Sequence, residues 1–262
     1  MIDWNAGIVS RGSWAAIQRC MIKAASGQPV TLGFLGGSIT QGSLASKPEL
    51  CYAYRVCQWW KDTFPQSRIT YINAGIGGTT SQFGAARVEE DLLRYEPDFV
   101  LTEFSVNDEN TLHFQETYEG LIRRILRSGA ALLLMNNVCY DTGSSAEEVH
   151  VQVAKHYQLP SVSMKSTLYA ALQRRELQAR EITPDDLHPN DRGHALVAEG
   201  ICHLLEQILH GQSALHQYRA ISHSNQLHHL MAQALGTQSS FVNFMGCFHT
   251  FFFCQRHREQ AI

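Results

Sequence analysis

The sequence predicts an α/β fold in which a parallel β-sheet is covered by helices on both faces. Short apolar runs of strand length alternate with longer segments of helical periodicity between residues 30 and 210. This alternation is typical of parallel strands joined by crossover helices. The chain has 262 residues, of which 44% are hydrophobic, so it is long enough to bury the core of one such domain.

Five segments are expected to be strands, because each is a short apolar run bounded by glycine, proline or polar residues. In chain order they are residues 30–35, 69–72, 99–104, 130–135 and 159–162. The segments between and after them are longer and have helical spacing. These helices are predicted at residues 52–64, 82–95, 118–127, 146–157 and 190–210.

The chain divides into three parts by composition. Residues 1–28 are interpreted as a lead-in segment and residues 29–210 as the α/β domain. Residues 211–262 have no Lys and no Asp but hold six of the thirteen histidines. We expect this tail to be disordered or loosely packed, as the product of a truncated or frame-shifted gene or as a divergent appendage. The rival interpretation is a helical extension, around residues 227–235, that packs on the domain.

Composition argues against several classes of function. The formal net charge is -3, and no basic stripe is visible, so a nucleic-acid partner is not expected. The seven cysteines are irregularly spaced without a CxxC motif, which argues against a zinc site and is typical of free thiols in a reducing compartment. No signal peptide or membrane span is recognised, so the expected location is the cytoplasm.

Ser38 is the first candidate for chemistry. It follows Gly36 and Gly37 at the carboxyl end of the first predicted strand, where backbone N–H groups near a helix start can stabilise an oxyanion. The simpler interpretation is a helix N-cap. The segment is not a phosphate-binding P-loop, because it lacks lysine. It is not an α/β-hydrolase nucleophile elbow either, because Thr40 stands where that motif needs glycine.

The next two strand ends carry further candidates. The second strand is followed by a glycine-rich loop, Asn73 to Thr79, that contains Gly75, Gly77 and Gly78. Glycines allow a ligand to approach the backbone closely, although a simple turn is equally consistent and the spacing does not meet the dinucleotide pattern G-x-G-x-x-G. The third strand is followed by Asn107, whose amide can donate to an oxyanion or form an ordinary Asx-turn.

Asp185 and His188 lie three residues apart just before the last predicted helix. One turn brings such a carboxylate to the imidazole Nδ1, which orients the ring as a catalytic triad requires. Asp186 is the rival for the acid role. Each of these elements is weak alone. Together they supply a nucleophile, a base, an orienting acid and oxyanion donors, which are the parts of an acyl-transfer site.

The blocks GGSIT, NAGIGGT, SVND and DDLHPN resemble those of the SGNH (GDSL-like) hydrolase family over roughly residues 29–208. The resemblance implies a flavodoxin-like α/β/α sandwich. It implies Ser38 as nucleophile, His188 as base and Asp185 as acid. The oxyanion donors would be the N–H groups of Ser38 and Gly78 and the side chain of Asn107. Two departures stand out, namely Gly37 in place of the family's Asp and Ser105 in place of its Gly.

The resemblance implies an esterase that needs no metal and no cofactor. The GGSIT form is similar to carbohydrate O-acetyl esterases, so an acetylated carbohydrate is the expected substrate. A lysophospholipase or thioesterase of the same family is the alternative, and a non-catalytic binding module is a third, since fold alone does not give function. Trp59 and Trp60 are expected to be core residues rather than a platform for a sugar.

Overall fold

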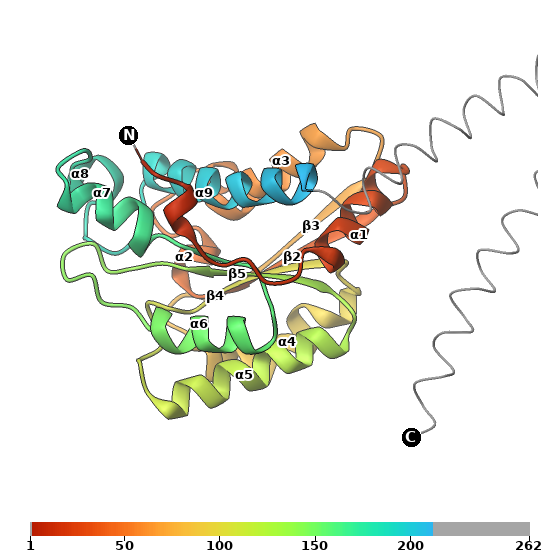
Figure 1. Ribbon diagram of the computed structural model, residues 1–262, viewed down its shortest axis with the longest axis horizontal. Helices are drawn as coiled ribbons and strands as arrows, with labels where there is room; N and C mark the ends of the chain where they lie inside the picture. The colour runs from red at the N-terminus through yellow and green to blue at the C-terminus, as the bar shows by residue number, and fades with distance from the viewer. Residues whose placement is uncertain (1, 212–262) are drawn as a thin grey trace, which may run out of the picture. The chain divides into compact units, whose positions relative to one another are not determined.

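The fold is a three-layer α/β/α sandwich around one mixed β-sheet (Figure 1). The computed structural model describes residues 2–211. The described sheet has six strands in the order β1-β6-β5-β4-β2-β3. They are β1 Ile8–Ser10, β2 Val30–Gly36, β3 Ile69–Gly75, β4 Phe99–Glu103, β5 Ala131–Asn136 and β6 Ser161–Ser163. The predicted α/β sandwich is confirmed. The expectations for residues 212–262 lie outside the described part of the chain.

The sheet differs from the predicted five-stranded parallel one by the strand β1. The five predicted strands are present and run parallel to one another. β1 comes from the segment interpreted as a lead-in and pairs antiparallel with β6, with Ile8 opposite Val162. Its apolar run, Ile8 and Val9, is only two residues long, which is too short to indicate a strand.

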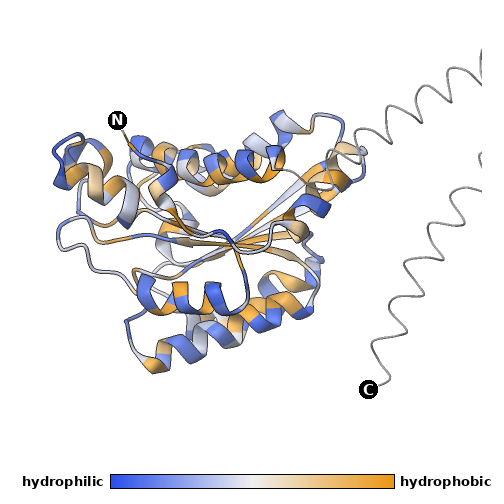
Figure 2. Ribbon diagram, viewed as in Figure 1, coloured by the Kyte–Doolittle hydropathy of each residue, from blue (hydrophilic) through white to orange (hydrophobic). Residues whose placement is uncertain are grey.

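Helices cover both faces of the sheet (Figure 1). On one face lie α1 Ala15–Ala25, α3 Tyr52–Thr63 and α9 Asp191–His210. On the other face lie α4 Ser81–Asp91, α5 Leu112–Arg127 and α6 Glu147–His156. The described residues also form three short α-helices, α2 Ser38–Gln41, α7 Ala170–Gln173 and α8 Ala179–Ile182. Figure 2 shows that the outer helices carry both hydrophilic and hydrophobic residues, as expected of amphipathic helices.

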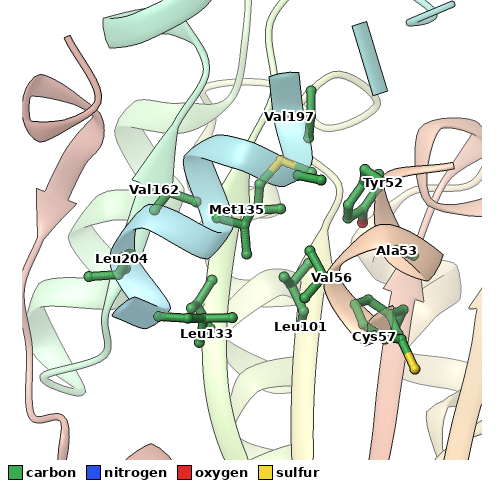
Figure 3. Packing of buried hydrophobic residues seen from close by; sticks show 14 of the residues in the cluster. Tyr52, Ala53, Val56, Cys57, Leu101, Leu133, Met135, Val162, Val197 and Leu204 are labelled. Atoms are coloured by element: carbon green, nitrogen blue, oxygen red, sulfur yellow. The ribbon is translucent and has the colours of Figure 1, made fainter. Parts of the chain in front are cut away.

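The core consists of two apolar layers, one on each face of the sheet. Alternate side chains of a strand point to opposite faces, so Leu133 and Met135 of β5 face α3 and α9, whereas Leu132 joins the layer under α4 and α5. Figure 3 shows the first layer, where Val56 of α3 approaches Leu101 of β4. All strand residues of β4 and β5 are buried, as expected of central parallel strands.

The order of the strands places three loops side by side. β2 pairs with β3 on one side and with β4 on the other, so Gly36 lies opposite both Gly75 and Glu103. The strand order changes direction here, because β3 lies on one side of β2 and β4 on the other. In open α/β sheets, ligands bind in the crevice at such a point. The loops that follow Gly36, Gly75 and Glu103 carry Ser38, Gly78 and Asn107. Within the described residues, no helix has both the length and the apolarity to cross a bilayer.

Candidate active site

Ser38 lies where the chain turns from β2 into α2. It is the first residue of α2, and Gly42, with a φ of 100°, ends this short helix. As the first helical residue, Ser38 has no intrahelical carbonyl for its backbone N–H, which leaves that N–H free to bind a ligand. Gly36 is needed for the turn, because a Cβ there would lie 2.5 Å from the carbonyl oxygen of Glu103.

The structure brings Ser38, His188 and Asp185 into one hydrogen-bonded chain. Nε2 of His188 is 2.9 Å from Oγ of Ser38, and Nδ1 of His188 is 2.7 Å from Oδ2 of Asp185. Ser38 is buried, whereas the side chain of His188 is 24% exposed. A base within hydrogen-bond distance of a hydroxyl can accept its proton. The arrangement is therefore suited to activating the serine hydroxyl as a nucleophile.

Asp185 is held as a carboxylate by its neighbours. Its partial burial acts to raise its pKa, but hydrogen bonds from the His188 ring and from the backbone N–H groups of His188 and Leu187 outweigh burial and lower the pKa to about 2. Oδ1 accepts both backbone N–H groups, at 2.7 Å from His188 and 3.1 Å from Leu187. A carboxylate fixed in this way orients the imidazole and favours its charged form.

Asp186 is placed elsewhere. Its carboxylate forms an ion pair with Arg180, with Nη2 of Arg180 2.7 Å from Oδ2. Its backbone has a φ of 64°, and its carbonyl oxygen accepts the N–H of Tyr140 at 2.6 Å. Of the two neighbouring aspartates, Asp185 is the one whose carboxylate meets His188.

Gly78 and Asn107 lie on the two loops that flank Ser38. Gly78 has a φ of 70°, and a Cβ built on it meets no atom within 4 Å, so this residue faces open space. The N–H of Gly77 is occupied, since it donates to Oε1 of Gln41 at 2.9 Å. Oδ1 of Asn107 is buried without a hydrogen-bond partner among the described residues. It lies 2.5 Å from where a Cβ of Gly37 would stand.

A buried pair that the sequence analysis did not single out stands behind these loops. Oδ1 of Asp108 accepts the N–H of Ser81, the first residue of α4, and Oδ2 is 3.0 Å from Nε2 of His150. His150 stacks on Tyr118 with ring centroids 3.6 Å apart. Asp108 therefore ties the Asn107 loop to the start of α4, just beyond Gly78. The partner His150 is 42 residues away in sequence, so no local pattern could identify it.

The start of α9 holds the loop between α2 and α3. Asp191 accepts the backbone N–H and the hydroxyl of Ser46, each at 2.7 Å. Nε2 of His194 is 3.1 Å from the carbonyl oxygen of Ser43, and its Nδ1 accepts the N–H of Tyr52 at 3.3 Å. Burial lowers the pKa of His194, which keeps the ring neutral in this bridging role.

Trp59 and Trp60 do not lie at this site. Trp60 is fully buried and packs against Phe99 at the start of β4, with ring centroids 5.5 Å apart. Trp59 packs edge-on against Trp60. Both therefore lie toward the amino ends of the strands, away from Ser38. Among the described residues, no three His, Cys, Asp or Glu side chains are grouped so that they could hold a metal ion.

Comparison with curated proteins finds a relative that matches most of this chain. The protein named Thioesterase 1/protease 1/lysophospholipase L1 from Escherichia coli (strain K12) is 25% identical over 192 residues. The match covers 70% of this chain and 86% of that protein.

Comparison with solved structures finds carbohydrate esterases. A two-domain esterase active on acetylated mannans, co-crystallised with mannopentaose, is 56% identical, with a TM-score of 0.79 over 79% of this chain. The present chain spans only 57% of that esterase's length. Axe2, an acetylxylan esterase from Geobacillus stearothermophilus, is 20% identical with a TM-score of 0.56, covering 69% of this chain and 95% of Axe2; this likeness concerns the fold alone.

The sequence also matches the model of one protein family. The match to the GDSL-like Lipase/Acylhydrolase family extends over residues 34–196, which is more than half of the chain. It begins before Ser38 and includes Asp185 and His188. The resemblance drawn from the four sequence blocks is confirmed, and the chain belongs to the GDSL-like lipase/acylhydrolase family.

Proposed function

We propose that the chain is a serine esterase that removes O-acetyl groups from carbohydrates, with Ser38, His188 and Asp185 as its catalytic triad. The observation that carries the proposal is the continuous hydrogen-bonded chain from Asp185 through His188 to Ser38 at the reversal point of the sheet. Gly78 and Asn107 flank the nucleophile on the two adjacent loops, where oxyanion donors are needed.

The acylation step follows from this geometry. Nε2 of His188 takes the proton of Ser38 as Oγ attacks the ester carbonyl carbon, and Asp185 stabilises the imidazolium that forms. The carbonyl oxygen becomes an oxyanion, which accepts hydrogen bonds from the N–H groups of Ser38 and Gly78 and from the amide of Asn107. His188 then gives its proton to the leaving alcohol, and the acetyl group remains on Oγ of Ser38.

Deacylation repeats the same proton transfers with water in place of the alcohol. His188 takes a proton from a water molecule, whose oxygen attacks the acetyl carbon, and the same donors hold the second oxyanion. The proton returns to Oγ as acetate leaves, so the free enzyme is restored. Every step uses a group that this chain supplies.

The substrate class rests on the relatives. The 56% identical esterase is active on acetylated mannans, and the likeness covers 79% of this chain. It supports an acetylated polysaccharide, with acetylated mannan as the first substrate to test. The 25% identical thioesterase and lysophospholipase supports the competing possibility of a longer acyl group.

The triad is tested by single substitutions assayed with p-nitrophenyl acetate. Ser38→Ala and His188→Ala should each lower kcat by several orders of magnitude, because nucleophile and base act as a unit. Asp185→Asn should cost less than either. Asp186→Asn is the matched control and should cost little, since its carboxylate pairs with Arg180. If Asp186→Asn proves more damaging than Asp185→Asn, the assigned acid is wrong.

The substrate is tested by comparing acyl chain lengths and acceptors. The enzyme should release acetate from acetylated manno-oligosaccharides and should hydrolyse acetyl esters faster than octanoyl esters. A preference for octanoyl esters or acyl thioesters would transfer the proposal to the lysophospholipase or thioesterase class. No turnover of any of these substrates would favour a binding module.

A further inference from the structure

We infer that Gln41 is a positioning residue of the oxyanion hole, which fixes the Gly77–Gly78 backbone so that the Gly78 N–H is the donor offered to the substrate. The inference rests on the proposed esterase function and adds a residue that neither the sequence blocks nor the triad geometry identifies. Gln41 lies at the end of α2, three residues after the nucleophile.

The contact that carries this inference joins the nucleophile helix to the neighbouring loop. The backbone N–H of Gly77 donates to Oε1 of Gln41 at 2.9 Å. Because a backbone N–H can only donate, the oxygen and not the nitrogen of the Gln41 amide must face Gly77. The N–H of Gly77 is thereby occupied, and the next N–H along the chain belongs to Gly78.

The position of Gly77 places this contact beside the reacting group. A Cβ on Gly77 would lie 2.9 Å from Oε1 of Gln41 and 3.7 Å from Cβ of Ser38. The Gln41 amide and the Ser38 side chain therefore lie within van der Waals reach of the same point. A Cβ on Gly78 would meet nothing within 4 Å, so the backbone opens toward solvent and substrate at that residue.

The loop needs such a restraint because two consecutive glycines are conformationally free. Glycine accepts positive and negative φ values about equally well, and Gly78 has a φ of 70°. Two other bonds link this loop to its neighbours, Ile76 N–H to the carbonyl of Gly36 and the Asn73 amide to the carbonyl of Thr40. Both precede Gly77 in sequence, and within the loop Oγ1 of Thr79 donates to the carbonyl of Ile76 at 2.7 Å. Of the bonds that tie this loop to a neighbouring element, the one from Gln41 lies nearest to the donor.

The exposure of Gln41 argues against a purely structural role. The residue is exposed, so its hydrogen bond is not required to satisfy a polar group in the core. Oxyanion donors act by being held in place before the reaction, which avoids reorganisation in the transition state. Loss of the Gln41 bond should therefore weaken transition-state stabilisation while leaving the fold intact.

The test compares Gln41→Met with Gln58→Met. Methionine is about as long as glutamine but lacks the amide acceptor. Gln58 is an exposed glutamine on α3 that bonds Asp62 at 2.8 Å, so it is a matched control far from the site. We expect Gln41→Met to lower kcat roughly tenfold, less than the ~10²–10³-fold cost of removing a donor outright. KM and the melting temperature should change little, and Gln58→Met should behave as the unaltered enzyme.

Two esters separate positioning from direct contact with the sugar. A positioning residue lowers kcat by the same factor for p-nitrophenyl acetate and for an acetylated manno-oligosaccharide. A loss confined to the oligosaccharide, or an unchanged kcat for both esters, overturns the assignment of Gln41 and leaves the esterase proposal standing. Absence of ester turnover by the unaltered enzyme overturns both.

Discussion

Gly37 shows how one residue distinguishes this chain from the familiar pattern of its family. The position before the nucleophile is Asp in the Gly-Asp-Ser-Leu block and Gly here. A Cβ at position 37 would lie 2.5 Å from Oδ1 of Asn107, closer than two such atoms can approach. The Asn107 side chain therefore occupies the space that any other residue at position 37 would need.

We predict that Gly37→Ala displaces Asn107 and lowers kcat. The loss should approach, but not exceed, that of Asn107→Ala, for which removal of an oxyanion donor implies ~10²–10³-fold. Steady-state kinetics with p-nitrophenyl acetate measure both variants. Gly120→Ala on α5 is the control, because a Cβ there meets nothing within 4 Å. An undiminished kcat in Gly37→Ala would show that Asn107 adapts without cost.

At the level of single residues, the sequence predicts the groups that the structure joins in one hydrogen-bonded chain, but not the groups that hold them. Ser38, Asp185 and His188 are predicted because, together with the strand-end loops, they supply the parts of an acyl-transfer site, although each is weak evidence alone. Gln41 and His150 had no such signal, since each acts through a partner that only the fold brings near. A glutamine after a glycine-rich turn, or a histidine on a helix, is ordinary until its neighbours are known.

The start of α9 acts as one element that joins the two halves of the site. Asp191 is three residues after His188 and binds Ser46, eight residues after Ser38. His194, one turn further along α9, holds Ser43 and Tyr52 of the same segment. The loop that follows the nucleophile and the loop that carries the base are thus fixed to the same helix end, which sets the distance between Ser38 and His188.

We predict that Asp191→Ala lowers kcat roughly tenfold, because it releases the Ser46 loop and loosens the Ser38–His188 contact; small displacements of reacting groups are costly in this way. Asp191→Asn should lose less, since its carbonyl oxygen can still accept the Ser46 N–H. Kinetics and melting temperatures of the pair give the answer. Equal kcat values in all three proteins would mean that the Ser46 contact does not position the triad.

The elements themselves were largely predictable, and the exceptions have physical reasons. The five parallel strands lie in segments that the sequence analysis predicts from short apolar runs, and the main helices have the expected helical periodicity. The strand β1, Ile8–Ser10, is not predicted because its apolar run is only two residues long. The helix α5 begins at Leu112 rather than at residue 118 because Thr111 caps it by accepting the N–H of Phe114, and its first turns are largely exposed.

For the molecule as a whole, the buried Glu103 links stability to pH. Burial raises its pKa to about 7, from an ordinary value of 4.5, against hydrogen bonds from Ser105 that act to lower it. The folded state therefore holds this proton more tightly than the unfolded state. The ionised carboxyl destabilises the fold above pH 7, and this destabilisation is relieved as the pH falls toward 4.5.

Two buried histidines act in the opposite direction. Burial lowers the pKa values of His150 and His194 below 6.5. Their neutral forms are favoured in the fold, so their contribution to stability is present above pH 6.5 and is lost as the pH falls below it. A comparison with Glu103→Gln isolates Glu103, because both histidines are common to the two proteins.

We predict that the stability of Glu103→Gln relative to the unaltered chain depends on pH. Replacing the carboxyl should raise the free energy of unfolding by about 2 kcal/mol more at pH 8 than at pH 5. Urea unfolding at the two pH values measures the change, and any fixed cost of the new amide cancels in the difference. A gap that stays constant between pH 8 and pH 5 would mean that Glu103 does not titrate in this range.

The hydrogen bond between Ser38 and His188 joins residues 150 positions apart. It therefore requires the chain from the end of β2 to the loop before α9 to be present. The proposed ester turnover is therefore a late event for each molecule, because it requires that nearly all of the described chain has left the ribosome. The release of acetate from an acetyl ester during cell-free translation would therefore report the time at which the fold is complete.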